Sequence, residues 1–362
     1  MLRNTTAHIT ALALALLILA GGLAGVLMIA GHGITRGLSG ARTESEQGAG
    51  SLVDGSAAAA FDRWVEEEHP FREPALEAIA TLRYLLLRQA GEGAVLGRDA
   101  WLFTAEELER HPGDEQRLRE RVAWVAARAG ELSAAGVEVV VVLVPAKARA
   151  ASAMVPVRLQ SLAGDRRYRL AADLLRREGV TVVDPDGALG PGDFFRRDTH
   201  WRPQGAEAVA ALVAGVTGPV GGSAFGVERR EPLALEGDLT SFLPLPEWLR
   251  VPHLLPEEYR PVTSTGSAGG GLFDTPEIPV ALVGTSYSAD ERWGFAAFLR
   301  RELAADVLNV AEQGLGPFEP LAAYLSGETI REIPPRLLIW EVPERYLTLP
   351  DYGLPPVDGD PS

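Results

Sequence analysis

Short apolar runs alternate with longer amphipathic segments along most of the chain. The apolar runs are rich in β-branched residues and cover Val137–Val144, Val180–Val183, Val280–Val283, Val307–Val310 and Leu337–Trp340. Between and around them apolar positions recur at helical spacing, which predicts helices over Asp114–Ala135, Arg166–Glu178, Pro203–Val216, Glu291–Ala304 and Pro317–Leu325. Continuous β-branched runs separated by amphipathic helices indicate a parallel sheet covered on both faces, so the sequence predicts an α/β fold.

The carboxyl ends of the predicted strands mark the first positions to inspect for a functional site. In an open parallel sheet the ligand crevice lies outside those ends. The segments that follow the strands are Pro145–Lys147, Asp184–Asp186, Gly284–Ser288 and Glu341–Arg345.

Other segments complete the predicted organisation of the chain. Residues 61–94 carry a helical pattern broken by Pro70, and residues 95–103 (VLGRDAWLF) predict a hairpin around a Gly-Arg-Asp turn. Residues 217–278 are rich in Gly and Pro with little periodicity, which favours a long insertion that covers the crevice. We expect a main domain over 95–347, including this insertion, and a tail over 348–362.

The N-terminal region contains an uncharged apolar stretch of 22 residues, Ile9–Ala30. At about 1.5 Å per residue it spans the ~30 Å hydrocarbon layer of a bilayer. A cleaved signal peptide usually has an apolar region of only ~7–15 residues, so we expect an uncleaved transmembrane anchor over 1–31, with a cleaved signal as the alternative. Residues 32–60, rich in Gly, Ser, Ala and Glu, predict a flexible tether.

The orientation of this span does not follow from its flanking charges. Arg3 precedes it, whereas Arg36 and Arg42 follow it, so the positive-inside count does not favour a cytoplasmic N-terminus. We predict that orientation nevertheless, because large C-terminal domains translocate largely regardless of charge.

Charge and composition exclude several classes of protein. Lys and Arg number 34 against 49 Asp and Glu, a formal net charge of −15. No basic run accompanies this balance, so nucleic acid is not an expected partner. The chain has no cysteine, which excludes Cys-ligated zinc, iron–sulfur clusters, thiol catalysis and disulfides. Nothing in the sequence calls for a cofactor.

One segment at a strand end carries a candidate nucleophile. Val280–Val283 leads into Gly284-Thr285-Ser286-Tyr287-Ser288, and a helical pattern follows. A serine at a sharp strand-to-helix turn exposes its hydroxyl near backbone N–H groups, which suits a nucleophile beside an oxyanion site. Similar turns also serve as plain helix caps, so both interpretations of Ser286 stay open on this segment alone.

A second segment offers a base and a carboxylate to orient it. Asp198 and His200 lie two residues apart immediately before Trp201. In an extended segment their side chains point the same way, and the carboxylate can fix the imidazole tautomer. Alternatively, Asp198 caps the helix predicted from Pro203 and His200 lies on the surface. His253 is a second-choice base, and no His/His spacing supports a metal site at His200.

Lys147 is the only lysine in the chain and follows the strongest apolar run. A lysine at a crevice position either anchors an anionic group or caps a loop, and the sequence leaves both open.

Taken together, six segments resemble the AlgJ/AlgX family of SGNH-like polysaccharide O-acetyltransferases. In chain order they are FDRWVEEEHPFR (61–72), GRDAWLF (97–103), VVLVPAK (141–147), DTHW (198–201), GTSYS (284–288) and LLIWEVPERYL (337–347). The resemblance implies an SGNH-hydrolase-like three-layer sandwich with a central, mainly parallel sheet, here preceded by one transmembrane helix. The N-terminal span makes the chain look closer to the membrane-anchored AlgJ branch.

The resemblance also implies the chemistry. Its motifs assign the nucleophile to Ser286, the base to His200 and the orienting carboxylate to Asp198. They imply transfer of acetyl groups to hydroxyls of an exported, alginate-like exopolysaccharide through an acetyl-serine intermediate. The usual Gly and Asn oxyanion donors of SGNH enzymes are not identifiable here.

Further contacts and partners follow as expectations. Candidate oxyanion or substrate-binding residues are Tyr287, Trp201, Lys147, Arg345 and Trp293. The aromatic ones either stack on sugar rings or pack in the core, and neighbouring arginines either offset the acidic net charge or form a solvated face. Whether the acceptor is a uronate polymer or a neutral one stays open.

The resemblance implies an MBOAT-type membrane acyltransferase as acetyl supplier, other polysaccharide export proteins as partners, and a single-pass protein of the bacterial inner membrane with its catalytic domain in the periplasm. Two other functions use the same residues differently. One is an SGNH-type carbohydrate esterase with water as acceptor, and the other is a non-catalytic polysaccharide-binding scaffold.

Overall fold

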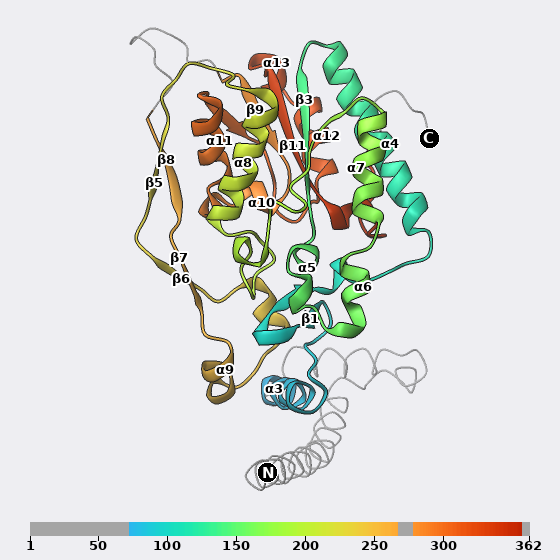
Figure 1. Cartoon of the computed structure of the whole chain (residues 1–362), viewed down its shortest axis with the longest axis vertical. Helices are drawn as coiled ribbons and strands as arrows, with labels where there is room; N and C mark the ends of the chain where they lie inside the picture. Colours follow the sequence, from blue (N-terminus) through green and yellow to red (C-terminus); the bar gives the residue numbers. More distant parts are fainter. Residues whose placement is uncertain (1–71, 267–277, 357–362) are drawn as a thin grey trace, which may run out of the picture. The chain divides into compact units, whose positions relative to one another are not determined.

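A five-stranded parallel sheet forms the centre of the fold in a computed structural model that describes residues 72–266 and 278–356 (Figure 1). Its strands are β3 (Glu138–Val144), β4 (Thr181–Val183), β9 (Val280–Val283), β10 (Val307–Asn309) and β11 (Leu337–Pro343). They lie in the order β10-β9-β11-β3-β4. The five predicted strands are confirmed. β11 extends beyond the predicted run to Pro343, because it pairs with β3 along its whole length.

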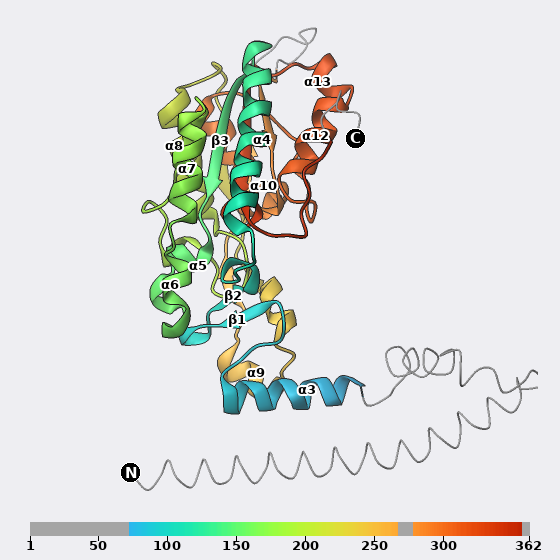
Figure 2. The ribbon, with the colours of Figure 1, turned by 90° about the vertical axis from the view of Figure 1, so that its right-hand side faces the viewer.

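Two helical layers cover the faces of this sheet. Alternate residues of β3 point to opposite faces, so Val140 and Val142 belong to one core cluster and Val141 and Leu143 to the other. The first cluster includes side chains from α8 (Pro203–Thr217) and α11 (Phe295–Leu303). The second includes side chains from α4 (Asp114–Ala134), α7 (Arg167–Arg177) and α12 (Phe318–Ser326). Figure 2 shows α4 and α7 along β3. The predicted α/β fold, with both faces of a parallel sheet covered, is confirmed.

The helix predicted over Glu291–Ala304 is divided in two. A 3₁₀ turn, η8 (Glu291–Trp293), ends at Gly294, and α11 begins at Phe295. Gly294 has a φ of +75°, a left-handed conformation that favours glycine and interrupts the helix. The prediction of one continuous helix is therefore wrong at this glycine.

The segments that flank the sheet hold short elements. The predicted hairpin is present as β1 (Ala94–Leu96) and β2 (Leu102–Thr104), paired antiparallel. Residues 217–278 contain more regular structure than their sequence predicts: β5 (Gly226–Arg229) pairs with β8 (Val262–Thr265), and β6 (Leu233–Leu235) pairs with β7 (Glu257–Tyr259). These strands are too short to produce a visible period. The remaining short helices are α5 (Lys147–Ala150), α6 (Gln160–Ala163), α10 (Ser286–Ala289) and α13 (Thr329–Glu332).

A second compact unit combines the described residues 72–90 with Leu243–Val251. Its described part contains α3 (Arg72–Leu82), a π-helical turn over Arg83–Leu87 and most of α9 (Glu247–His253). The described part of the predicted lead-in over 61–94 is thus largely helical.

The predicted anchor over 1–31 and tether over 32–60 lie outside the described residues. Among the residues that are described, no helix combines the length and apolar character needed to cross a bilayer.

Candidate active site

Ser286 lies where β9 turns into α10, at the carboxyl edge of the sheet. Thr285 is the N-cap of α10, and its hydroxyl accepts a hydrogen bond from the Tyr287 N–H at 3.4 Å. Within the described residues the Ser286 N–H has no hydrogen-bond partner. The turn therefore combines a serine hydroxyl with a free backbone donor, which is the arrangement an oxyanion site needs.

Asp198 and His200 lie in a loop whose two ends are held together. Phe194 forms an isolated antiparallel bridge with Trp201, and the Phe195 N–H donates to the His200 carbonyl at 3.3 Å. Within this loop, Asp198 Oδ1 lies 2.7 Å from His200 Nδ1 and 3.0 Å from the His200 backbone N. His200 Nε2 lies 2.7 Å from Ser286 Oγ. The structure thus brings the three predicted catalytic residues together in one hydrogen-bonded series.

The hydrogen-bond partners of His200 determine which of its ring nitrogens carries the proton. Burial alone would raise the pKa of Asp198, but hydrogen bonds and charge from His200, with the Asp238 N–H, outweigh it and lower that pKa below its usual value. An ionised carboxylate only accepts hydrogen bonds, so Nδ1 carries the imidazole proton. Nε2 then has a free lone pair to accept from the Ser286 hydroxyl, the state required of a general base.

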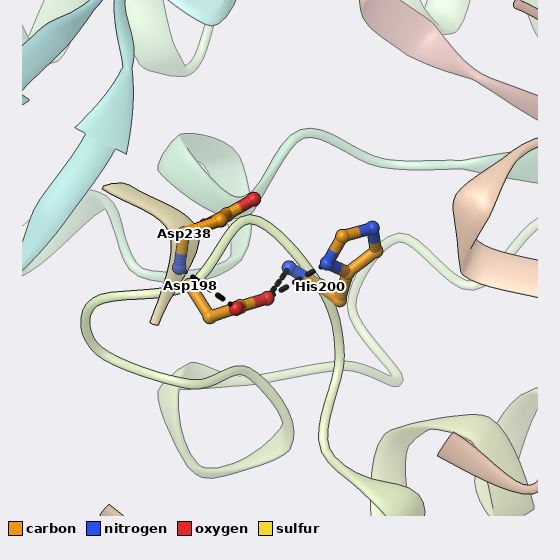
Figure 3. Close-up of side chains that lie close together, drawn as sticks. All are labelled: Asp198, His200 and Asp238. Carbon is orange, nitrogen blue, oxygen red and sulfur yellow. Dashed lines mark hydrogen bonds and ion pairs between the residues drawn. The ribbon is translucent and has the colours of Figure 1, made fainter. Parts of the chain in front are cut away.

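Asp238 is a site residue that the sequence analysis missed. Its backbone N–H donates to Asp198 Oδ2 at 3.0 Å, and its Oδ1 accepts from the Thr199 N–H at 2.8 Å. Figure 3 shows Asp238 beside Asp198 and His200. It lies in the segment 217–278, where only the turn-forming Gly237-Asp238 pair offers a sequence signal.

In the described part of the chain, these three residues form a group that could hold a metal ion, since one ligand atom from each of Asp198, His200 and Asp238 lies within 4.8 Å of the others. Hydrogen bonding already accounts for the atoms concerned. Nδ1 of His200 faces the Asp198 carboxylate, and Asp238 Oδ1 accepts from a backbone N–H. The arrangement fits a hydrogen-bonded support for the imidazole.

Lys147 is buried, with 1% of its surface exposed, and it caps a loop. Its Nζ donates to the Asp198 carbonyl at 2.7 Å and to the Arg196 carbonyl at 3.2 Å. Burial lowers the pKa of Lys147 to about 8, although Glu107 and Asp198 act in the opposite direction. The lysine therefore holds the loop that carries Asp198. Binding of an external anion, the other expectation, is not supported for a buried ammonium group.

The predicted aromatic contacts to sugar are also not supported, because these side chains are buried. Trp201, Tyr287 and Trp293 each expose 1% or less of their surface. Trp293 stacks on the His200 ring at 5.4 Å, and the Tyr287 hydroxyl donates to the Thr199 carbonyl at 2.7 Å. These three side chains pack around the catalytic residues. Their burial depends on the tertiary structure, which residue type alone does not reveal.

Arg345 is similarly buried, so the prediction that it meets an anionic acceptor is not supported. Its Nε lies 3.1 Å from Glu106 Oε2, and its guanidinium lies 5.8 Å from the Tyr287 ring centroid. The second-choice base, His253, has a side chain outside the described residues.

Two hollows of about 440 and 510 Å³ share Asp99, Arg196, Arg202 and Glu257 in their walls. Arg202 Nη1 pairs with Glu257 Oε2 at 3.1 Å. Arg196 is exposed, and its guanidinium has no partner in the described part of the chain. A free cation thus lines a concave surface two residues from Asp198.

Comparison with known proteins agrees with this geometry. The family model described as the SGNH hydrolase-like domain of acetyltransferase AlgX matches residues 94–344. The chain is 34% identical over 359 residues to the Azotobacter vinelandii protein named "Probable alginate O-acetylase AlgJ", covering 95% of this chain and 92% of that protein.

Solved structures give the same result. The O-acetyltransferase domain of Pseudomonas putida AlgJ matches with a TM-score of 0.62 and 35% identity, covering 71% of this chain and 93% of that chain. Pseudomonas aeruginosa AlgX matches with a TM-score of 0.53 and 26% identity, covering 69% of this chain and 62% of that chain. The TM-score and the sequence identity are both higher for the AlgJ domain than for AlgX.

Proposed function

The chain belongs to the SGNH hydrolase-like acetyltransferase family of AlgX and AlgJ, and from this membership we propose that it acetylates alginate through an acetyl-Ser286 intermediate. The family resemblance expected from the six sequence segments is confirmed, as is its closeness to AlgJ. The chain is an O-acetyltransferase, and its substrate and residue roles are the proposal.

The first half-reaction forms the acetyl-enzyme. His200 Nε2 takes the Ser286 proton as Oγ attacks the carbonyl carbon of an acetyl ester, giving a tetrahedral intermediate. The intermediate collapses with cleavage of the ester C–O bond, and the His200 Nε2–H protonates the leaving oxygen. In the second half-reaction His200 takes the proton of a sugar hydroxyl, whose oxygen attacks the acetyl carbon. The second tetrahedral intermediate then breaks the bond between the acetyl carbon and Ser286 Oγ, and the His200 Nε2–H returns the proton to Oγ.

The oxyanion of each intermediate lies next to the Ser286 N–H, the donor that is free in this turn. A preorganised donor of this kind is worth about 2.7–4 kcal/mol of transition-state stabilisation. The Asp198 carboxylate stabilises the imidazolium that forms in each half-reaction.

The observation that carries the proposal is the unbroken series Asp198–His200–Ser286, with both links at 2.7 Å. A scaffold that only binds polysaccharide needs no such alignment. The alginate acceptor is supported by the name of the AlgJ relative and by the free Arg196 guanidinium in the wall of the two hollows. That cation is available to pair with a uronate carboxylate.

The location and partners of the protein complete the proposal. We infer a single-pass protein of the inner membrane, anchored by the span over 9–30, with the catalytic domain in the periplasm. An MBOAT-type acyltransferase in the same membrane would supply acetyl groups, and the tether would raise the local concentration of the two proteins. Alginate biosynthesis proteins such as AlgX are the expected export partners.

The test uses the full chain in detergent with p-nitrophenyl acetate as donor and either alginate or cellulose oligosaccharides as acceptor. Mass spectrometry follows acetylated sugar, and p-nitrophenol release follows ester cleavage, with Ser286→Ala as control. Ser286-dependent acetylation of the alginate oligosaccharide is expected. Ser286-dependent cleavage without acetylated sugar would favour the esterase, and no reaction with any ester would favour the scaffold.

A further inference from the structure

A carboxylate is buried directly beneath the turn that carries Ser286. Glu341, on β11, has no exposed surface. Its Oε2 accepts from the Thr285 N–H at 2.7 Å and lies 3.1 Å from both the Thr285 Oγ1 and the Ser288 Oγ. The residues bound to Glu341 therefore lie on both sides of Ser286 in the chain.

The donors to Glu341 come from the turn. The Thr285 hydroxyl accepts from the Tyr287 N–H and keeps its own proton to donate to Glu341. The Thr285 N–H is a donor only. Glu341 thus acts as the acceptor at the centre of the turn, and it connects the N-cap of α10 to the central strand of the sheet.

The glycine of the Gly-Thr-Ser segment is explained by the same contact. A Cβ on Gly284 would lie 2.5 Å from Glu341 Oε2 and 2.8 Å from the Glu341 Cβ. Gly284 does not have a left-handed φ, so glycine is needed here for space. The Glu341 side chain therefore occupies the space that a side chain at residue 284 would need.

Joining a turn to a strand through a buried carboxylate costs desolvation free energy. Burial raises the pKa of Glu341, while bonds from Thr285 and Ser288 and the charge of Arg345 act against that rise. An apolar side chain in β11 would give a stable core without this desolvation. The retained carboxylate therefore points to a requirement of the turn itself.

We propose that Glu341 is a positioning residue that fixes the Ser286 hydroxyl and N–H in reacting geometry. This inference rests on the proposed function, because it assigns a role in the same acyl transfer. Glu341 contacts no substrate in the proposed reaction; it acts through Thr285 and Ser288. Because a displacement of about 1 Å at a reacting atom can reduce a rate by ~100-fold, a small relaxation of this turn is enough to slow acylation.

The test compares Glu341→Gln with Asp184→Asn in the full chain. Gln has the same shape but presents an NH₂ group where a second acceptor oxygen stood. Asp184 is the control, because its carboxylate also accepts three hydrogen bonds, from Tyr168, Arg176 and the Asp186 N–H, but it is 29% exposed and follows the edge strand β4. The readouts are kcat and KM for p-nitrophenyl acetate, the rate of Ser286 labelling by a sulfonyl fluoride, and Tm.

We expect Glu341→Gln to lower kcat and the labelling rate about 10- to 100-fold with KM nearly unchanged. Asp184→Asn should lower Tm but keep kcat. Ser288→Ala, which removes a single donor, should give a smaller loss in the same direction.

Glu341→Gln with wild-type kcat and labelling rate would overturn the inference, as would equal kcat losses in Glu341→Gln and Asp184→Asn. The proposed function fails separately, because that failure is an unreactive Ser286 in the wild-type chain or acetylated sugar formed by Ser286→Ala.

Discussion

The Asp238 N–H donates a 3.0 Å hydrogen bond to Oδ2 of Asp198, the oxygen that His200 does not use. In return, Asp238 Oδ1 accepts from the Thr199 N–H, next to Asp198 in the chain. The Leu239 N–H also donates to the Arg197 carbonyl at 3.2 Å. The segment after α8 thus binds the loop of Asp198 and His200 on both sides and limits the positions that the imidazole can take.

Replacing the Asp238 side chain tests one of these two hydrogen bonds. Asp238→Ala removes the acceptor for Thr199 but keeps the backbone donor to Asp198. Because one such hydrogen bond contributes about 0.5–1.5 kcal/mol, kcat for ester cleavage should fall about threefold to tenfold. Asp238→Asn keeps an acceptor oxygen and should stay within about twofold of wild type. Equal losses in the two variants would show that this acceptor does not position the loop.

A substitution at Gly237 tests how closely the segment around Asp238 approaches the loop that carries Asp198. The φ of Gly237 is +88°, and a Cβ there would lie 2.3 Å from the Arg197 carbonyl oxygen. Gly136 has the same φ of +88° but no atom within 4 Å of its Cβ position.

Alanine at either glycine carries the backbone strain, of order 1 kcal/mol. Gly237→Ala should lose at least about 2 kcal/mol more stability than Gly136→Ala, since backbone must move to admit the methyl group. Urea unfolding of both variants measures this difference. Equal losses would mean that the contact with Arg197 is not tight in solution.

Lys147 gives a prediction about pH. Its pKa falls from 10.5 in the unfolded chain to about 8 in the folded one, because burial penalises the charged form. Well below pH 8 both states hold the proton and the penalty is present in full. Between pH 8 and 10.5 the unfolded state binds more protons than the folded state, so the contribution of Lys147 to stability rises with pH.

The comparison with Lys147→Met isolates this contribution. The free energy of unfolding of wild type minus that of Lys147→Met should increase by about 3 kcal/mol from pH 8 to 10.5, from 10.5 − 8 = 2.5 units at ~1.36 kcal/mol each. Urea unfolding across this range measures it. A flat or falling difference would contradict a buried, charged Lys147.

The sequence predicted the sheet and the three catalytic candidates because both depend on local signals. Strands such as Val137–Val144 are continuous β-branched runs, and Asp198, His200 and Ser286 lie in short motifs next to a strand or helix end. The division of the helix at Gly294 was missed, since apolar spacing continues across the glycine.

Asp238 and Glu341 show why the supports of the site were not predicted. Asp238 bonds Asp198 across 40 positions of sequence, inside a segment without periodicity. Glu341 was singled out only as the first residue after the predicted strand Leu337–Trp340, whereas β11 continues to Pro343. Their roles depend on which backbone N–H groups the fold brings to them. The burial of the aromatic and basic candidates was not predicted for a related reason, because residue type does not reveal burial.

The proposed passage of the acetyl group through Ser286 is tested most directly by a search for the acetyl-Ser286 intermediate. The full chain would be mixed with p-nitrophenyl acetate, without sugar, quenched in acid and analysed by peptide mass spectrometry. One acetyl group is expected on the peptide that contains Ser286. The label should be lost on addition of alginate oligosaccharide, which becomes acetylated, and should be absent in His200→Ala. An acetyl group on a different residue, or acetylated sugar formed by Ser286→Ala, would show that Ser286 does not carry the acetyl group.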